Sequence, residues 1–182
     1  MDIHRAGTDI LHEISLHFEN LNFIQLESLA KQIMKADAVF LLGAGRSKLM
    51  LSTFCLRLNH LGITSYIVGE IPCPPTTPKS LIIAASGSGK TCSIMSILNK
   101  QKQLGTNIFL ITANNEDSFE EYADNILRID VPNSLFKKLP GSNQLMRTAF
   151  EQIVFLIGES IVYELSQDIP HDTIASRHTN LE

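Results

Sequence analysis

Hydroxyl side chains and glycines alternate in one short segment, Ser86-Gly87-Ser88-Gly89-Lys90-Thr91. Five apolar residues, Leu81 to Ala85, precede this segment, and a helical pattern follows it. Glycines let a loop turn tightly beside a ligand, and the unpaired amides of a helix start bind anions together with hydroxyl donors. The segment therefore predicts a strand, a phosphate-sized loop and a helix, with Ser86, Ser88 and Thr91 holding an anionic group.

Two other interpretations of this loop have to be weighed. Gly89-Lys90-Thr91 matches the end of a nucleotide-binding P-loop, but that motif has a glycine where this chain has Ala84. The strand expected near Asp130 also contains Arg128, so it offers no simple acidic end to support magnesium. A plain strand-to-helix turn is the second alternative, because Gly and Ser are common in turns. Three hydroxyls at these offsets favour a sugar-phosphate loop over both.

Composition limits the classes of protein and partner. A chain of 182 residues with 44% apolar content suits one globular domain with a substantial core. A formal charge of −4 offers no electrostatic basis for binding nucleic acid, so we expect a small-molecule partner. The apolar runs are too short to span a membrane and the N-terminus is polar, so we expect a cytoplasmic protein. The three cysteines suggest neither disulfides nor a metal site.

The elements that position the loop follow from hydrophobic periodicity. The expected helices cover residues 9–18, 22–35, 91–104, 116–122 and 144–166, with one more carrying Leu49, Phe54, Leu58 and Leu61; the expected strands cover 38–42, 64–68, 81–85, 107–111 and 125–131. Short apolar strands alternating with helices indicate a parallel sheet covered on both faces. We therefore predict a flavodoxin-like three-layer α/β/α sandwich with a five-stranded parallel sheet. Leading helices fill residues 1–36, the α/β core 37–166 and a polar tail 167–182.

Two glycine-containing loops follow strands in this scheme, one at Gly43 to Ser47 and the other at Ser86 to Thr91. In open parallel sheets, ligands bind beyond the carboxyl ends of the strands, where the winding direction changes. We therefore expect the two loops to face one crevice. The proline-rich segment 71–79 is interpreted as a stiff structural connection without a chemical role.

Several motifs together resemble one family. They are Gly43-Ala44-Gly45-Arg46-Ser47, Arg57-Leu58-Asn59-His60-Leu61-Gly62, Val68-Gly69-Glu70, Ser86-Gly87-Ser88-Gly89 and Phe150-Glu151-Gln152. The combination resembles the sugar isomerase (SIS) domain family, and within it the 6-phospho-3-hexuloisomerases of the ribulose monophosphate pathway. The resemblance covers nearly the whole chain, including the terminal segment from His178 to Glu182.

This resemblance implies an isomerase that interconverts 3-hexulose 6-phosphate and fructose 6-phosphate without a metal or an organic cofactor. It also implies a homotetramer with sites near the subunit interfaces. The substrate and its phosphate would be held by Ser47, Ser86, Gly87, Ser88, Gly89, Lys90 and Thr91, and Arg46 would be a secondary ligand. Arg46 could equally anchor the start of its helix through carboxylates.

Glu151 matches the proposed proton acceptor of the family. Moving a carbonyl by one carbon requires the removal and return of a proton through an enediol or enediolate, which one carboxylate can perform. The helix around Glu151 is apolar on almost every side. The residues alone favour the single solvent-facing stripe of the helix over a position in apolar surroundings; the match to Phe150-Glu151-Gln152 reverses that order.

His178 is the second catalytic candidate, as an acid that opens a cyclic substrate or polarises its carbonyl, including that of a neighbouring subunit. A frayed C-terminal tail is the alternative, and the polar residues around His178 leave both open. His60 is interpreted as a capping or packing residue at the end of its helix.

The chain departs from the family pattern at two places. Lys90 stands where the family usually has glutamate, and Gln144-Leu145-Met146-Arg147-Thr148-Ala149 replaces Gln-Pro-Met-Gly-Ser-Leu, so that Arg147 brings a large cation to a glycine position. A non-catalytic module that binds sugar phosphates is therefore the alternative to an active isomerase, and a nucleotide-binding protein ranks third. The retained Glu151 favours the isomerase.

Overall fold

The computed structural model describes residues 1–115, 117–131, 142 and 144–180. Its helices are α1 (Ile3–Glu19), α2 (Phe23–Lys35), α3 (Gly45–Leu61), α4 (Cys92–Gln103), α5 (Thr148–Ser166) and α6 (His171–Ala175), with a 3-10 helix η1 (Asp117–Glu121). Its strands are β1 (Val39–Gly43), β2 (Ser65–Ile67), β3 (Leu81–Ala85), β4 (Asn107–Thr112) and β5 (Asn125–Arg128). Glu116, at the start of a predicted helix, and the last two residues of the terminal motif lie outside the described residues.

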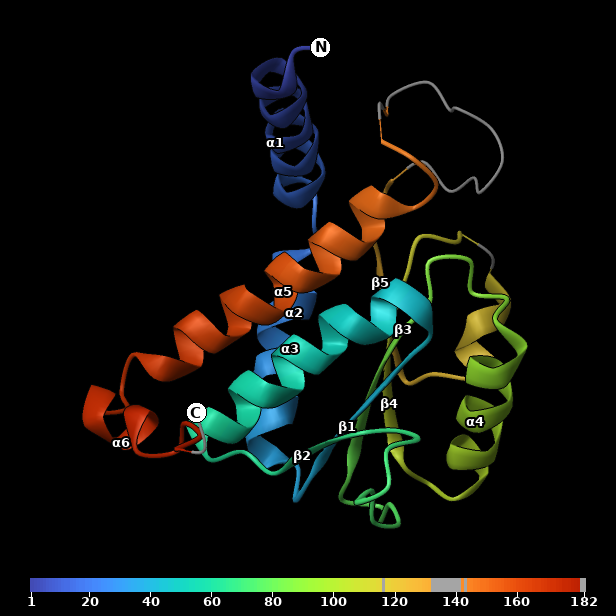
Figure 1. The fold of residues 1–182 in the computed structure, drawn as a ribbon. Coiled ribbons are helices and arrows are strands. Elements are labelled where there is room, and N and C mark those ends of the chain that lie inside the picture. The colour runs from blue at the N-terminus through green and yellow to red at the C-terminus, as the bar shows by residue number, and fades with distance from the viewer. Residues whose placement is uncertain (116, 132–141, 143, 181–182) are drawn as a thin grey trace.

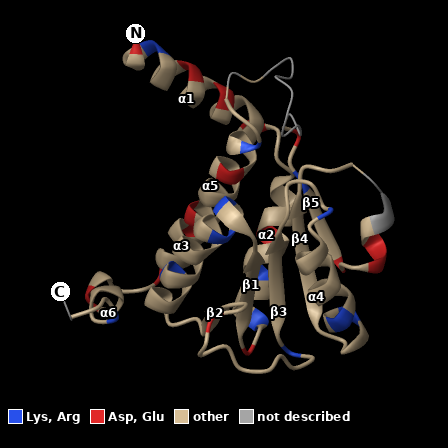
Figure 2. Cartoon of the chain, turned by 45° about the vertical axis from the view of Figure 1, so that its right-hand side comes forward, with Lys and Arg blue, Asp and Glu red and all other residues tan. Residues whose placement is uncertain are grey.

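All five strands are parallel and lie in the order β2-β1-β3-β4-β5. The strands β1 to β4 contain no charged residue, as expected for strands covered on both faces (Figure 2). The winding direction reverses at β1, because β2 lies on one side of it and β3 on the other. The predicted three-layer α/β/α fold is confirmed, and its switch point lies between β1 and β3.

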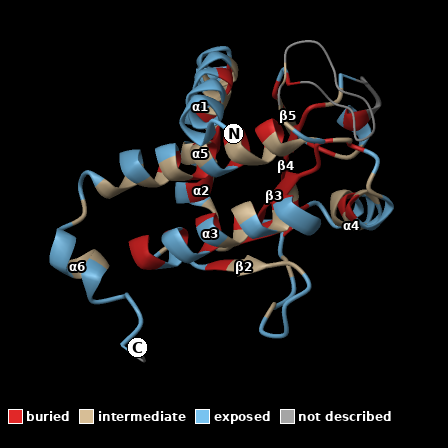
Figure 3. Ribbon diagram, turned by 45° about the horizontal axis from the view of Figure 1, so that its top comes forward, coloured by how far each residue is buried: buried red, intermediate tan, exposed pale blue. Residues whose placement is uncertain are grey.

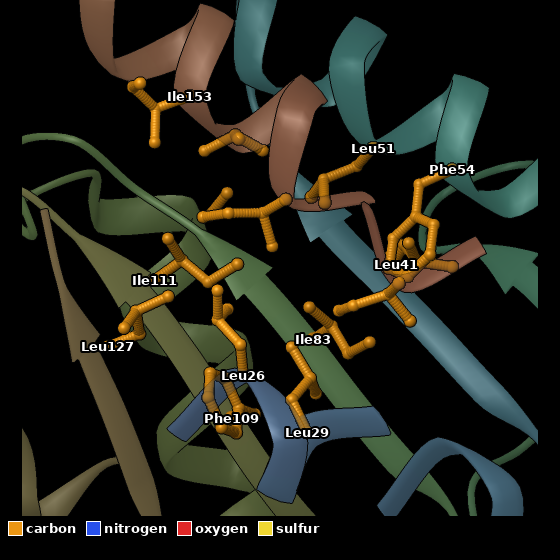
Figure 4. Packing of buried hydrophobic residues seen from close by; sticks show 14 of the residues in the cluster. Leu26, Leu29, Leu41, Leu51, Phe54, Ile83, Phe109, Ile111, Leu127 and Ile153 are labelled. Atoms are coloured by element: carbon orange, nitrogen blue, oxygen red, sulfur yellow. The ribbon is translucent and has the colours of Figure 1, made fainter. Parts of the chain in front are cut away.

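Two hydrophobic clusters form the core, one on each face of the sheet. On one face, Leu41 and Ile83 pack with Leu51 of α3 and Ile153 of α5 (Figure 4). On the opposite face, the strands pack against α4 and η1 (Figure 1). Successive strand residues point to opposite faces, so each apolar run supplies both clusters. Buried residues accordingly follow the strands and the inner sides of α3 and α5, whereas α1 and α6 are largely exposed (Figure 3).

Several predicted boundaries were wrong by a few residues. α1 begins at Ile3 rather than at residue 9, because the Asp2 side chain caps it by accepting a hydrogen bond of 2.9 Å from the Arg5 amide. α5 begins at Thr148 rather than at residue 144, since Met146 has a φ of +54°, outside the right-handed helical region. β5 ends at Arg128, the predicted helix 116–122 is the 3-10 helix η1, and the tail contains α6.

α3 and α5 pack side by side across one face of the sheet (Figure 1). Gly158 of α5 allows this contact, because a Cβ atom placed there would lie 3.0 Å from the Phe54 ring of α3. The first turns of both helices consequently lie near each other at the carboxyl edge of the sheet. No helix within the described ranges has the length and apolar character needed to cross a membrane.

Candidate active site

A cavity of about 400 Å³ lies beyond the carboxyl ends of β1 and β3, at the switch point of the sheet. Gly43 and Ala85, the last residues of these strands, are paired, so the loops that follow begin side by side. The start of α5 forms a third wall. The cavity is lined by Ala44, Gly45, Arg46, Ser47, Ala85, Ser86, Gly87, Ser88, Thr91, Ile94, Leu145, Met146, Arg147, Thr148, Phe150 and Glu151. The two predicted loops therefore do face one crevice.

The serine loop is held from behind by the end of β4. The carbonyl groups of residues 86, 87 and 88 accept hydrogen bonds from the Thr112 hydroxyl (2.8 Å), the Ala113 amide (3.3 Å) and the Asn114 side-chain amide (2.7 Å). Three successive carbonyls are thus directed toward β4. The hydroxyl oxygens of Ser86 and Thr91 lie 3.4 Å apart at the cavity. This anchoring gives the loop a defined shape before any ligand arrives.

Three helices start at this cavity. Their N-cap residues, Ala44 of α3, Thr91 of α4 and Arg147 of α5, all line it. In the described structure none of these residues makes a side-chain capping bond. Unpaired amides and the positive ends of helix dipoles favour an anion at such a place. The site is therefore electrostatically suited to a phosphate group.

Glu151 lies in the first turn of α5 and lines the same cavity. Its side chain is only 15% exposed, so it faces the cavity rather than bulk solvent. Arg46, in the first turn of α3, donates a hydrogen bond from Nε to Oε2 of Glu151 and forms an ion pair with it. The pair joins helices whose residues are 105 positions apart in the sequence. Of the two roles predicted for Arg46, the structure shows contact with a carboxylate at its helix start.

Arg147 is a second arginine in the cavity, and the sequence prediction did not include it among the ligands. Its side chain is half-buried at the start of α5. Burial lowers the pKa of its guanidinium, and the nearby Glu151 carboxylate opposes that shift. Among the described residues, the cavity combines hydroxyl groups with the guanidinium groups of Arg46 and Arg147 and the carboxylate of Glu151.

Most of the predicted site residues come together in the cavity. They are Arg46, Ser47, Ser86, Gly87, Ser88, Thr91 and Glu151. Two predicted phosphate ligands are placed differently. Lys90 is exposed and does not line the cavity, and Gly89 is buried against the ring of Phe119.

α6 and the segment after it lie near the last turn of α3 (Figure 1), and this segment contains His178. Its ring packs against that of His60, with 5.3 Å between the centroids, and the neighbouring Arg177 donates a hydrogen bond of 3.1 Å to the His60 carbonyl. His60 is 14 positions from Arg46 along α3, or about 21 Å at 1.5 Å per residue. His178 therefore does not reach the cavity of its own chain.

Sequence reasoning missed the wall formed by Leu145, Met146, Arg147 and Thr148. The predicted helix included Leu145, Met146 and Arg147, whereas α5 begins at Thr148. The signal that could have located them is the departure from the family pattern at Arg147, which adds a cation four residues before Glu151.

This geometry defines a class: a parallel α/β domain with a hydroxyl-bearing loop at its switch point and a carboxylate across the cavity. The chain belongs to the SIS domain family, whose model matches residues 32–148. It is 33% identical over 181 residues to a 3-hexulose-6-phosphate isomerase of Bacillus subtilis (strain 168), covering 96% of each chain. It is 34% identical over 159 residues to a protein of the same name from Methanocaldococcus jannaschii, covering 86% of this chain and 84% of that one.

A solved structure agrees with these relatives. A Methanococcus jannaschii protein aligns with a TM-score of 0.83 and 29% identity, covering 98% of this chain and 99% of that one. Its crystal structure was used to infer a function as 3-hexulose-6-phosphate isomerase. The family expected from the motifs is therefore confirmed, and the expected enzyme class, an isomerase, agrees with the names of these relatives.

Proposed function

We propose that this protein is a sugar-phosphate isomerase that interconverts 3-hexulose 6-phosphate and fructose 6-phosphate, with Glu151 as the base. One observation carries the proposal: Glu151 faces the same cavity of about 400 Å³ as the serine loop. A phosphate held by the loop hydroxyls and helix amides leaves the sugar chain to extend toward the carboxylate. The relatives named 3-hexulose-6-phosphate isomerase support this choice of substrate.

In this mechanism the Glu151 carboxylate removes the proton from carbon 2 of the 3-hexulose, and the electron pair forms the double bond of an enediolate between carbons 2 and 3. The same carboxyl group returns the proton to carbon 3, while the hydroxyl proton on oxygen 2 passes to oxygen 3, so that the carbonyl group ends at carbon 2. The reaction is redox-neutral within the substrate, and Glu151 carries the carbon-bound proton. A positioned general base contributes about a hundred- to ten-thousandfold in rate.

Arg46 has a supporting role in this proposal. Its guanidinium is paired with Glu151 in the structure and orients that carboxylate. The positive end of the α5 dipole also lies at Glu151, because Glu151 is in the first turn of that helix. The base therefore has a defined position before substrate enters.

Further features belong to the proposal. We propose that residues 1–182 form a single SIS domain, that the protein works in the cytoplasm as a homotetramer in the ribulose monophosphate pathway, and that the sites lie near subunit interfaces. A catalytic role for His178 would require it to enter the cavity of a neighbouring subunit, because its own cavity is about 20 Å away along α3.

The experiment that tests the proposal is deuterium exchange. Purified protein is incubated with fructose 6-phosphate in deuterated water, and NMR follows the hydrogens next to the carbonyl. Exchange at carbon 3 is the expected result for a 3-hexulose isomerase, whereas exchange at carbon 1 would indicate an aldose–ketose isomerase. Glu151→Gln should remove the exchange and retain the binding of fructose 6-phosphate.

Glu159→Gln is the matched control, because Glu159 lies two turns further along α5 and does not line the cavity. Full exchange by Glu151→Gln would exclude Glu151 as the base. Saturable binding of hexulose phosphates without any exchange would instead favour a non-catalytic sugar-phosphate-binding module.

A further inference from the structure

Arg147 occupies a particular place relative to the serine loop. A Cβ atom placed on Gly87 would lie 3.0 Å from Cδ of Arg147 and 3.1 Å from the ring of Phe150. The aliphatic part of Arg147 therefore lies directly against the loop backbone at Gly87, beside a fully buried phenylalanine. Only a residue without a side chain leaves room for this contact.

This contact determines where the charged end of Arg147 can go. Gly87 lies between Ser86 and Ser88, and both serines line the cavity together with Arg147. Because Cδ of Arg147 lies against Gly87, its guanidinium group can reach a ligand that is bound by Ser86 and Ser88. The arginine fork matches two oxygens of a phosphate, whereas a lysine offers a point charge.

Two other cations, Arg46 and Lys90, lie near the loop. Arg46 is paired with Glu151, and its side chain is 58% exposed. Lys90 is exposed and does not line the cavity. Arg147 is half-buried at the N-terminus of α5, where desolvation strengthens its attraction for an anion.

We propose that Arg147 closes the phosphate subsite, donating paired hydrogen bonds to the phosphoryl oxygens of a substrate seated on the Ser86–Thr91 loop. This inference rests on the proposed function and specifies how the ligand is recognised. The site binds phosphorylated sugars, and Arg147 is the residue that selects for the phosphate group. The side chain of Arg147 packs against Gly87. Arg46 remains the hydrogen-bond and ion-pair partner of Glu151, whose charge also acts on Arg147.

The test compares Arg147→Met, which keeps the stem and removes the charge, with Arg147→Lys, which keeps the charge and loses the fork. Lys79→Met is the matched control for a lost surface cation, because Lys79 is exposed at the opposite end of β3. Calorimetry measures the Kd for inorganic phosphate and for fructose 6-phosphate. The exchange assay gives KM and kcat, and circular dichroism verifies the fold of each variant.

Arg147→Met should weaken both affinities and raise KM by about ten- to a hundredfold, as expected for the loss of hydrogen bonds to a charged group. Its kcat should stay within about threefold, since a general base that is left intact keeps its contribution to the rate. The affinities and the KM of Arg147→Lys should lie between those of Arg147→Met and those of the parent protein. Gly87→Ala should displace the arginine stem and raise KM as well.

A lower kcat with unchanged KM and unchanged Kd for phosphate would overturn the inference, because it would mean that Arg147 acts through Glu151. Unchanged kinetics and affinities in Arg147→Met would overturn it as well. A parent protein that binds phosphate through Arg147 but exchanges no hydrogen would refute only the isomerase. A parent protein that binds neither phosphate nor fructose 6-phosphate would refute both proposals.

Discussion

Replacing Gly89 by alanine tests how the serine loop is packed. Gly89 has a φ of +64°, and a Cβ atom placed there would lie 2.7 Å from Cε1 of Phe119 and closer still to Cζ. Phe119 is 3% exposed and belongs to the hydrophobic cluster that α4 covers, so its ring has little freedom to retreat. Gly89→Ala therefore introduces two unfavourable changes at once.

The free-energy costs of these two changes in Gly89→Ala can be estimated separately. A left-handed backbone costs an alanine about 1–2 kcal/mol, and overpacking a core typically costs about 1–3 kcal/mol. The lower entropy of the unfolded alanine chain offsets about 0.4–1 kcal/mol. We expect Gly89→Ala to reduce the free energy of unfolding by about 2–4 kcal/mol, a large part of the about 5–15 kcal/mol that stabilises a typical domain.

Gly105→Ala is the matched control. Gly105 has a φ of +74°, but nothing lies within 4 Å of an added Cβ atom, so this variant carries the backbone cost alone. Urea unfolding of both variants should place Gly89→Ala about 2 kcal/mol below Gly105→Ala. In thermal melts this difference corresponds to about 6 °C for a chain of this size.

The same substitution should also weaken ligand binding. The Gly89 amide donates a hydrogen bond of 3.0 Å to the Ser86 carbonyl, so a displaced Gly89 would distort the hydroxyl-bearing turn. Phe119→Leu in the Gly89→Ala background should restore part of the stability by making room for the methyl group. Equal losses for Gly89→Ala and Gly105→Ala would show that the contact with Phe119 is not tight and would refute the reasoning.

Two further predictions concern groups that titrate. Burial lowers the pKa of His60, with added repulsion from Arg57 and His178, so the unfolded chain binds a proton more readily than the folded one. The free energy of unfolding should therefore fall as the pH drops below about 6.5, the pKa of histidine in an unfolded chain. Urea unfolding at pH 5.5 and 7.5 should show a smaller fall for His60→Gln. An equal fall in the variant and the parent protein would contradict the role given to His60. Burial likewise raises the pKa of Cys55, whereas Cys92 is exposed, so iodoacetamide at neutral pH should label Cys92 first and Cys55 only after unfolding. Labelling of both thiols at similar rates in the folded protein would disprove the burial of Cys55.

The buried strands were the most predictable part of the fold. Runs such as Leu81 to Ala85 contain only apolar residues, and a short run of this kind between turn residues leaves few alternatives to a central parallel strand. The shared crevice was predicted from the two glycine loops, because both follow strands and ligands bind beyond the carboxyl ends of parallel strands; the structure adds that the two strands are neighbours at the switch point. The residues on these loops could thus be assigned to one site from the sequence.

The remaining parts of the site depend on contacts that periodicity does not describe. The start of α5 depends on the backbone conformation at Met146, and this start decides that Arg147 lies against Gly87. The pairing of Arg46 with Glu151 joins residues 105 positions apart, so it depends on how α3 packs on α5. Gly89 was assigned to ligand binding by its motif, but the structure gives it a packing reason, the ring of Phe119. Each of these features is determined by tertiary packing rather than by the local sequence pattern.

The three helices that begin at the cavity link recognition to folding. Ala44, Thr91 and Arg147 leave the first amides of α3, α4 and α5 without a capping side chain in the described structure. One oxyanion bound among them would serve as a common cap for elements that come from distant parts of the chain. Ligand at a hundred times its Kd adds about 2.7 kcal/mol to the stability of any protein that binds it only when folded. In a cell rich in phosphorylated metabolites, the nutrient supply would then help to decide how long each copy of this protein survives.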